Sequence, residues 1–311
     1  DALDYADHTL ALRADAELGV RRRTGGAIAY RRGHQTLGLD LTRGVADELD
    51  ESVLFDNVTL GGFFRYGSRE ARGNVEAGAE LEVQRYANLE SLTDGRDFTS
   101  IGPYALFSLR LSGDTRLLLE TRFTSVDFED DRRDRGDIEL LTGLEFVATG
   151  ALSGAARVGG RVSRFDAEDR DDESALVFEA DVEYRPVEFV RLRLEGVREL
   201  DNTADGGGDE QAEETVLQLS YRHDWSSRFR TTAFVGQEFD ERDCPDPDVR
   251  IGRGGLTLGL QVRRWLELGA SVRYVQRSAD DCAEDGADGG GDDADLDFNR
   301  TQSGLFVRAT L

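Results

Sequence analysis

Apolar and charged residues alternate along residues 175–200, which read ALVFEADVEYRPVEFVRLRLEGVREL. From Leu176 to Tyr184 the even positions are apolar or aromatic, and the odd positions from 179 to 183 are acidic. The alternation resumes over residues 190–195, where arginine takes most of the polar positions. Because successive side chains of a strand point to opposite faces of a sheet, this pattern predicts two strands with one apolar and one charged face.

We predict a turn at residues 185–188 between these two strands. The acidic row would then lie beside an arginine row, as expected where paired strands line a wet interior. The predicted partners of Glu179, Asp181 and Glu183 are the arginines of the two neighbouring strands, namely Arg157, Arg161, Arg191 and Arg193. The predicted lipid-facing residues on the other face are Leu176, Phe178, Ala180 and Val182.

The same alternating unit repeats along the chain, beginning with residues 10–21, and no stretch keeps a helical period. Short turns and long acidic connections follow one another in strict alternation between the predicted strands. This asymmetry is typical of outer-membrane barrels, which have short periplasmic turns and longer extracellular loops. The sequence therefore predicts an all-β fold with one domain over residues 1–311, a single antiparallel up-and-down transmembrane β-barrel. A soluble β-sandwich is the alternative outside the membrane.

The predicted number of strands depends on the first 43 residues. From Leu54 onward the pattern predicts about thirteen strands, and a barrel with both termini in the periplasm needs an even number. Between Ala27 and Arg43 the apolar parity changes, so either a bulge shifts the phase or residues 32–35 form a tight turn between two short strands. With that turn the total is about sixteen strands, and about fourteen is the alternative.

Composition narrows the class of protein. The 311 residues carry a formal net charge of -25, and all 38 basic residues are arginine. No apolar run reaches the roughly 20 residues of a membrane-spanning helix, but a β-barrel exposes only alternate residues to lipid. The acidic balance argues against nucleic acid as a partner, because binding to phosphate backbones needs a basic surface. We expect a mature chain from which a leader has been removed.

Cys244 and Cys282 are the two cysteines of the chain, and each lies in a polar connection. In an exported protein this arrangement predicts one disulfide. Acidic connections such as residues 280–297 offer oxygen ligands for weak divalent-cation binding, yet their spacing does not match a calcium-binding loop. We therefore expect solvated connections, with no bound cofactor and no metal site.

Charged residues on the inward parity are the candidate functional residues. Buried charges are tolerated when they are paired or hydrated. These side chains would therefore either line a pore for solutes or form ion pairs that rigidify a narrow barrel. The candidate pore-lining residues are Glu80, Glu82, Arg110, Glu120, Arg122, Glu139, Glu145, Arg157, Arg161, Glu179, Asp181, Glu183, Arg191, Arg193, Arg230, Arg263 and Arg273.

The histidines and aromatic residues bear on the class of function. Barrel hydrolases commonly use histidine as a general base, but the predicted strands place His8, His34 and His223 near short turns without an assembled nucleophile, so we expect no enzyme. Aromatic residues also flank the short turns, where they would form a periplasmic girdle at the headgroup level. These residues are Tyr184, Phe189, Trp225, Phe229 and Trp265.

The last predicted strand carries the most specific motif. Residues 302–309, QSGLFVRA, fit the polar-x-Gly-x-x-apolar-x-apolar assembly signal in the final strand of bacterial outer-membrane proteins, although Leu311 stands where an aromatic residue is usual. The signal residues would be Gln302, Gly304, Val307, Ala309 and Leu311. With this motif and its repeated hairpins, the chain resembles Gram-negative outer-membrane β-barrels, in particular the porin families of proteobacteria, including barrels linked to exopolysaccharide export.

The resemblance implies a bacterial outer-membrane location with both termini periplasmic, contact with lipid and lipopolysaccharide, and insertion by the barrel-assembly machinery. It further implies passive passage of small hydrophilic solutes or ions through a charged, Arg/Glu-lined lumen, with acidic outer connections that concentrate cations at the mouth. The alternative is a non-conducting structural or partner-binding barrel, whose connections contact a surface protein or a polysaccharide.

Overall fold

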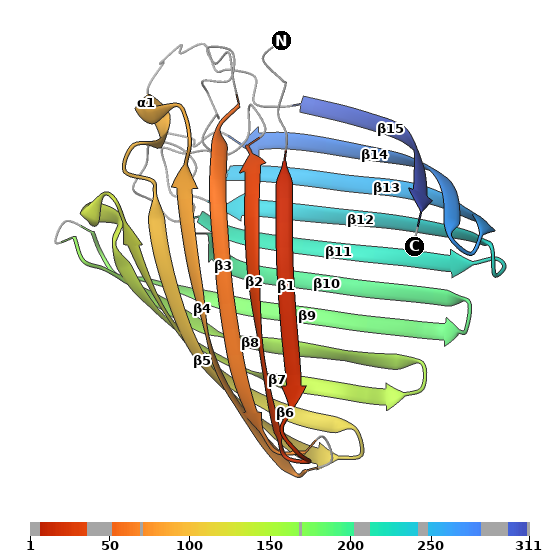
Figure 1. Ribbon diagram of the computed structural model, residues 1–311, viewed down its shortest axis with the longest axis horizontal. Helices are drawn as coiled ribbons and strands as arrows, with labels where there is room; N and C mark the ends of the chain where they lie inside the picture. The colour runs from red at the N-terminus through yellow and green to blue at the C-terminus, as the bar shows by residue number, and fades with distance from the viewer. Residues whose placement is uncertain are drawn as a thin grey trace. The chain divides into compact units, whose positions relative to one another are not determined.

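The computed structural model describes residues 7–35, 52–68, 71–167, 170–201, 212–241, 248–280 and 298–309. These residues form an all-β structure with fifteen antiparallel strands in one sheet, and the order of the strands in the sheet is their order in the chain (Figure 1). Up-and-down topology of this kind needs only hairpin connections. The predicted all-β, up-and-down fold class is therefore confirmed.

The first eight strands are β1 (His8–Glu17), β2 (Arg22–His34), β3 (Leu54–Tyr66), β4 (Gly73–Tyr86), β5 (Phe98–Ser112), β6 (Thr115–Phe128), β7 (Arg135–Thr149) and β8 (Leu152–Phe165). The other seven are β9 (Glu173–Val187), β10 (Val190–Asp201), β11 (Ala212–Asp224), β12 (Phe229–Glu241), β13 (Asp248–Arg263), β14 (Leu266–Asp280) and β15 (Phe298–Ala309). Two short helical segments, α1 (Glu90–Thr93) and the 3₁₀ turn η3 (Asp131–Arg133), lie between strands. No helix in the described ranges is long and apolar enough to cross a membrane.

Residue contacts divide the chain into two compact units. Within the described ranges, unit 1 comprises the chain up to Gly143 together with Val158–Leu176. Unit 2 comprises Leu144–Arg157 and the chain from Val177 onward, so the boundary runs through β7, β8 and β9. The two units are described separately below.

The described residues hold fifteen strands, close to the predicted number of about sixteen. The thirteen strands expected from Leu54 onward are present as β3 to β15. The predicted tight turn at residues 32–35 is wrong, because β2 runs unbroken to His34 and pairs directly with β3. An apolar parity change alone did not reveal whether the strand ended. Residues 36–51, where that turn would have led, lie outside the described residues.

The odd count changes the placement of the strand ends. β1 starts beside the longer connections of unit 1, because the short connection 18–21 follows it. β15 ends beside the short connections of unit 2, because it follows the longer connection 281–297. The described strands therefore do not begin and end beside the same kind of connection, and the side on which each terminus lies stays a prediction.

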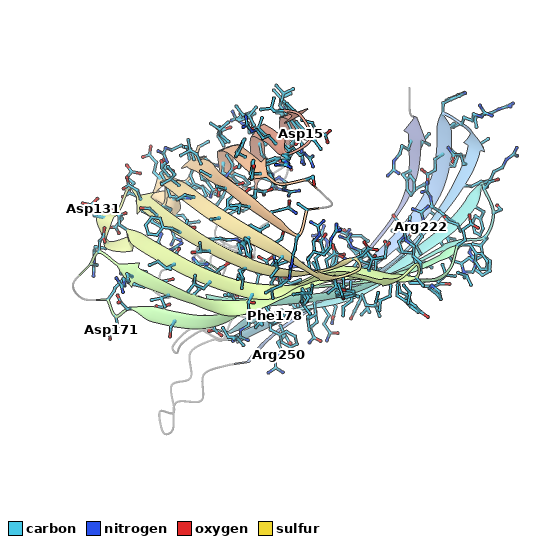
Figure 2. All side chains as sticks on the ribbon, turned by 90° about the horizontal axis from the view of Figure 1, so that it is seen from below. Asp15, Asp131, Asp171, Phe178, Arg222 and Arg250 are labelled. Carbon is cyan, nitrogen blue, oxygen red and sulfur yellow. The ribbon has the colours of Figure 1, made fainter. Side chains whose placement is uncertain are left out.

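Connections of two to six residues alternate along the chain with connections of six to nineteen residues, so the two sets overlap at six residues. The short ones are residues 18–21, 67–72 and 113–114 in unit 1, and 150–151, 188–189, 225–228 and 264–265 in unit 2. The longer ones are residues 35–53, 87–97, 129–134, 166–172, 202–211, 242–247 and 281–297. Because neighbouring strands are antiparallel, each unit has a short-connection end and a long-connection end. Figure 2 shows Asp131 and Asp171 at the long-connection end of unit 1.

Apolar residues form continuous rows across the strands of unit 1. Leu12 lies opposite Ile28, and Ile28 lies opposite Leu60. Leu60 lies in turn opposite Leu81, and Leu81 opposite Ile101. Since directly opposed residues share a face, one side of β1–β5 is apolar. This face is uncovered: Leu12 is 64% exposed, and the others in the row are exposed or half-buried.

Unit 2 has the same construction. Val182 lies opposite Leu194, which lies opposite Leu219, and a further row joins Leu260, Leu268 and Val307. Val307 is 71% exposed. The buried apolar residues of the described chain are few, and the cluster of Phe98, Val126 and Phe128 lies on the charged side of unit 1. A single-layer sheet has no second layer against which its apolar face could pack, so this face needs an apolar solvent.

Bulges adjust the strands next to three short connections. The register shifts by one residue near Ser112 in β5, near Arg191 in β10 and near Arg263 in β13. At the second of these, β9 continues through Pro186 to Val187, so the predicted turn at residues 185–188 shrinks to residues 188–189. A bulge accommodates Pro186 because proline has no N–H for the strand ladder.

Gly159 provides a test of the packing between β7 and β8. A Cβ added at Gly159 would overlap the carbonyl oxygen of Leu140, whereas one added at the adjacent Gly160 would meet its nearest atom, the Ala175 oxygen, at 3.8 Å. We expect Gly159→Ala to lower the free energy of unfolding by about 1–3 kcal/mol, the usual cost of overpacking. Gly160→Ala, the matched control, should be neutral or slightly stabilising. Urea unfolding in detergent measures both, and equal effects would contradict the close approach.

Candidate functional site

The charged face of β9 and β10 carries the ion pairs that the sequence predicted. Arg193 donates to Asp181 at 2.6 and 2.9 Å, in a two-point contact. Arg191 lies 3.1 Å from Glu183, and Arg157 of β8 pairs with Glu179. Each acid thus has an arginine partner on a neighbouring strand, as expected for the side of a sheet that holds charge in a hydrated space. A pore-lining role for these residues stays a prediction.

The charged face of unit 1 has a comparable group of ion pairs around Arg122. This side chain lies 2.6 Å from Glu120 on its own strand and 3.1 Å from Glu139 on β7. Glu82 of β4 instead accepts a hydrogen bond of 2.6 Å from Asn57. Three predicted positions, Glu120, Arg122 and Glu139, are therefore brought together on β6 and β7.

Arg161 pairs with Asp137, which was not among the predicted candidate residues. Its guanidinium lies 2.6 Å from Asp137, which also contacts Arg135 at 3.3 Å. Asp137 is 3% exposed, and Ser163 beside Arg161 on β8 is fully buried. Within the described residues, Asp137 Oδ1, Arg135 Nη2 and Ser163 Oγ make no hydrogen bond. The cluster is thus a buried, incompletely satisfied ion pair, which costs free energy to desolvate and depends on both partners.

Sequence reasoning missed Asp137 and Arg135 because it assigned residues 127–137 to a connection. The structure begins β7 at Arg135. The signal was present in the parity, since Asp137 shares the odd positions of Glu139 and Glu145. The prediction also missed the ion pairs Arg65–Glu76 and Arg253–Glu238, each at 2.6 Å.

Two further predicted arginines, Arg230 and Arg273, lie on the charged face of unit 2. Arg230 of β12 lies 2.8 Å from Glu267 of β14. The guanidinium of Arg273 lies over the ring of Phe234, 5.8 Å from its centroid. For the other predicted positions, Glu80, Arg110, Glu145 and Arg263, a pore-lining role stays a prediction.

Aromatic rings on the charged face lie on glycines of the next strand. Directly opposed pairs are Phe63 with Gly25, Tyr104 with Gly78, Phe234 with Gly255 and Phe306 with Gly269. A Cβ at each of these glycines would come within 3 Å of the opposing ring. Glycine therefore lets each ring lie flat on the sheet, which shields the bare backbone and keeps the space above it free for longer side chains.

A cavity of about 410 Å³ lies on β12–β15 of unit 2. Arg273, Arg308 and Gln302 supply nitrogen donors, Ser271 and Thr257 supply hydroxyls, and Phe234 and Phe306 supply ring faces. Glu267 lies 3.4 Å from Arg308, so one of the two arginines is partly neutralised. Such a lining suits a small hydrated, hydroxyl-bearing or anionic solute.

Aromatic side chains cluster at the short-connection end of unit 2. Trp225 stacks on His223 with ring centroids 3.9 Å apart, and Phe189 lies 5.4 Å from the same imidazole. Trp225 also donates to the Thr231 hydroxyl at 3.0 Å, and the Tyr221 hydroxyl lies 2.8 Å from His223 Nδ1. This geometry combines an apolar ring with a polar tip, as in interfacial girdles.

The other two histidines lie elsewhere than predicted. His8 begins β1 and His34 ends β2, so both are at the long-connection end of unit 1 rather than near short turns. The error follows from the turn wrongly expected at residues 32–35. His34 pairs with Asp7 at 2.8 Å. No group of three metal-ligating side chains comes together in the described ranges.

The C-terminal motif lies on β15 with the predicted alternation. Gln302 and Gly304 face Arg273 and Ser271 on the charged side, whereas Val307 lies opposite Leu268 on the apolar side. Ala309 ends the strand, and Leu311 lies outside the described residues. Cys244 and Cys282 also lie outside them, so the disulfide stays a prediction.

Two ion pairs with equal separation allow a test of burial. Both Arg161–Asp137 and Arg193–Asp181 are at 2.6 Å, but the side chains of the second pair are 44% and 53% exposed. We expect Asp137→Asn to lower the free energy of unfolding by about 3–5 kcal/mol, because it leaves buried arginines uncompensated. Asp181→Asn should cost at most about 1 kcal/mol. Chemical unfolding in detergent compares them, and similar losses would show that burial does not govern these pairs.

Asp134, in the connection before β7, supplies a pH-dependent test. Burial raises the pKa of its carboxyl, helped by the charges of Asp127, Asp131 and Asp166, while a hydrogen bond from the Phe128 N–H at 2.7 Å opposes the shift. With a raised pKa the folded state binds the proton more tightly. The carboxyl therefore favours folding at acidic pH, and that contribution disappears as the pH rises through the raised pKa.

We accordingly expect Asp134→Asn to stabilise the protein at neutral pH, since the amide oxygen keeps the bond from the Phe128 N–H without placing a negative charge at this partly buried position. Below the usual carboxyl value of 3.8 the difference from the unaltered protein should vanish. Unfolding curves recorded at neutral pH and at acidic pH measure the difference in the free energy of unfolding. If the variant were more stable by the same amount at both pH values, the ionised carboxylate would not be the cause.

The chain resembles known proteins at the level of the fold. No protein-family model and no curated protein sequence matches the chain. Among solved structures, the FrpB iron transporter of Neisseria meningitidis (F5-1 variant) aligns with a TM-score of 0.57 and 9% identity, over 90% of this chain and 54% of that one. BauA, the ferric preacinetobactin receptor of Acinetobacter baumannii, aligns with a TM-score of 0.51 and 10% identity, over 87% and 54%.

The chain spans about half the length of these two structures. Both are outer-membrane β-barrel proteins of Gram-negative bacteria. Their likeness to the fifteen-stranded sheet bears out the resemblance drawn from the repeated hairpins: this chain has the fold of Gram-negative outer-membrane β-barrel proteins.

Proposed function

We propose that this chain is an outer-membrane barrel that gives small hydrophilic solutes or ions passive passage through a charged lumen. The observation that carries the proposal is the division of the sheet into an exposed apolar face and a face of cross-strand Arg–carboxylate pairs. Lipid suits the first face, and water suits the second. A soluble protein rarely leaves so continuous an apolar surface uncovered.

Passage requires the sheet to close around a lumen, and closure is part of the proposal. β1 and β15 are the two ends of the strand order, and each is exposed on its apolar face, at Leu10 and Leu12 in β1 and at Leu305 and Val307 in β15. In hydrocarbon, unpaired strand edges are too costly to persist. With an odd number of antiparallel strands, β1 and β15 run in the same direction, so they would meet as a parallel pair or through one further strand.

The charged face would then line the lumen. Exposed pairs such as Arg193–Asp181 can release either partner to a passing ion, because their net interaction in water is small. The cavity on β12–β15 would be a binding site at which a solute contacts arginine, amide and hydroxyl groups together. Acidic longer connections would raise the local concentration of cations at one mouth.

Orientation and surroundings follow from the same proposal. The short connections would face the periplasm and the longer acidic ones the exterior, as is usual for such barrels. Lipid and lipopolysaccharide would cover the apolar face, and the barrel-assembly machinery would recognise β15. The iron and preacinetobactin named for the similar structures are not carried over, since this chain spans only about half their length.

The buried cluster of Arg135, Asp137 and Arg161 favours a second candidate, a non-conducting barrel with a structural or partner-binding role. A buried ion pair fixes strand register without offering exchangeable charge. In that case the acidic connections would contact a surface protein or a polysaccharide.

Reconstitution into planar bilayers separates the candidates. The full chain, refolded in detergent, should migrate faster in SDS gels before boiling than after, and it should then give stepwise ion conductance. Cations should be preferred in a salt gradient because of the acidic mouth, and the preference should weaken as ionic strength rises.

Three outcomes would contradict the first candidate in different ways. A heat-dependent gel shift without conductance steps would favour the non-conducting barrel. Extraction of the folded chain without detergent would favour a soluble β-sandwich. Steps with anion preference would retain the pore but reject the role given to the acidic connections.

A further inference from the structure

A small hollow of about 270 Å³ lies at the short-connection end of unit 1. It lies between the connection that follows β1 and the one that follows β3. Its charged lining consists of Arg21, Arg22, Arg23, Arg65 and Glu17. Four cations around one carboxylate are unusual in a chain with a formal net charge of -25.

Two of the four arginines have acidic partners on their own side of the sheet. Arg65 lies 2.6 Å from Glu76, and Arg23 lies 3.4 Å from Asp15. Arg21 and Arg22 are exposed, and no carboxylate among the described residues pairs with them. The hollow therefore keeps an uncompensated positive charge, which is the first requirement for binding an anion.

Backbone bonds hold the two connections together. The N–H of Gly67 donates to the carbonyl of Arg21 at 2.8 Å. Gly67 has φ +120°, and a Cβ there would collide with Asn74, so glycine is needed for this approach. The arginines thus project from a fixed pair of turns rather than from independent ones.

Exposed apolar side chains adjoin the arginines. Leu18 and Val20, in the same connection, are 55% and 88% exposed. Arg22 lies opposite Tyr66, and Tyr66 lies opposite Val75, so this arginine is on the apolar face of the sheet. A free inorganic anion needs only the cations, whereas a lipid with an anionic headgroup uses the cations and the apolar residues at once.

We propose that this hollow, the arginine hollow, binds the phosphate of an anionic phospholipid. Guanidinium groups match phosphate oxygens with paired N–H donors, and Arg21 and Arg22 supply them without first breaking an ion pair. Leu18, Val20, Tyr66 and Val75 contact the start of the acyl chains. The inference rests on the proposed membrane location, and it adds a lipid class and a site to it.

The test compares two double variants of the full chain. The substituted arginines of both variants lie on β2 or in the turn that precedes it. R21Q/R22Q removes the two unpaired cations, and R31Q/R32Q removes two arginines at the other end of β2 as a matched control. Each protein is purified in detergent, exposed to equal amounts of phosphatidylglycerol and phosphatidylethanolamine, and measured by native mass spectrometry for retained lipid. We expect R21Q/R22Q to bind phosphatidylglycerol about 30-fold more weakly, the factor for two interfacial cations, and the control to bind as before.

Other results would overturn the inference. Equal losses in both variants would mean general electrostatic attraction rather than a site. Displacement of phosphatidylglycerol from the unaltered protein by millimolar inorganic phosphate would mean an ion site without a lipid component. Equal retention of the two lipids by the unaltered protein would also reject the site. This measurement needs no substitution, so it tests the inference even if a variant fails to fold.

The proposed function has its own readout in the same samples. A heat-dependent gel shift shows that each variant has folded as a barrel. If the shift is present and the lipid preference is absent, only the arginine hollow fails; if the unaltered protein shows no shift, the membrane proposal itself fails.

Discussion

Each strand of a single-layer sheet has two faces, and each face must contact a solvent whose polarity matches its side chains. In this chain the alternation puts Leu12, Ile28 and Leu60 on one side and Asp15, Arg65 and Glu76 on the other. A slip of one residue in any register would send arginine to the apolar side and leucine to the charged side. The register is therefore fixed by both solvents at once, which explains how a sheet with few buried apolar residues holds one pairing from β1 to β15.

Burial then divides the ion pairs into two kinds. Arg161–Asp137 and Arg193–Asp181 have the same separation, but the first pair is nearly inaccessible to water and the second is half exposed. A buried pair is held by its desolvated surroundings and resists exchange. An exposed pair gains little from its partner and can exchange it for a solute ion. If the proposed pore function holds, structural and transport roles can therefore coexist on one face, because burial rather than residue type separates the two kinds of pair.

Sequence alternation reveals which face a residue occupies, but not where a strand starts or which residue it meets. The faces of Glu179, Asp181 and Glu183 followed from parity alone, as did the thirteen strands from Leu54 onward. β2 was divided wrongly, because a parity change looks the same for a turn and for an irregular strand. Asp137, a partner of Arg161, was missed because the predicted strand began after it, whereas β7 begins at Arg135. Partners depend on register, which bulges such as the one at Pro186 reset by a residue.

The uneven distribution of charge adds an argument about orientation. Most of the net negative charge lies in the longer connections, whereas arginines gather around the short ones, as in Arg21–Arg23 and Arg264. The formal charge of -25 is therefore unevenly distributed between the two kinds of connection. An acidic end is repelled by anionic headgroups, and an arginine-rich end with exposed apolar neighbours is attracted to them. In a membrane whose leaflets differ in charge, the two ways of inserting such a sheet differ in free energy, so its side chains can favour one orientation.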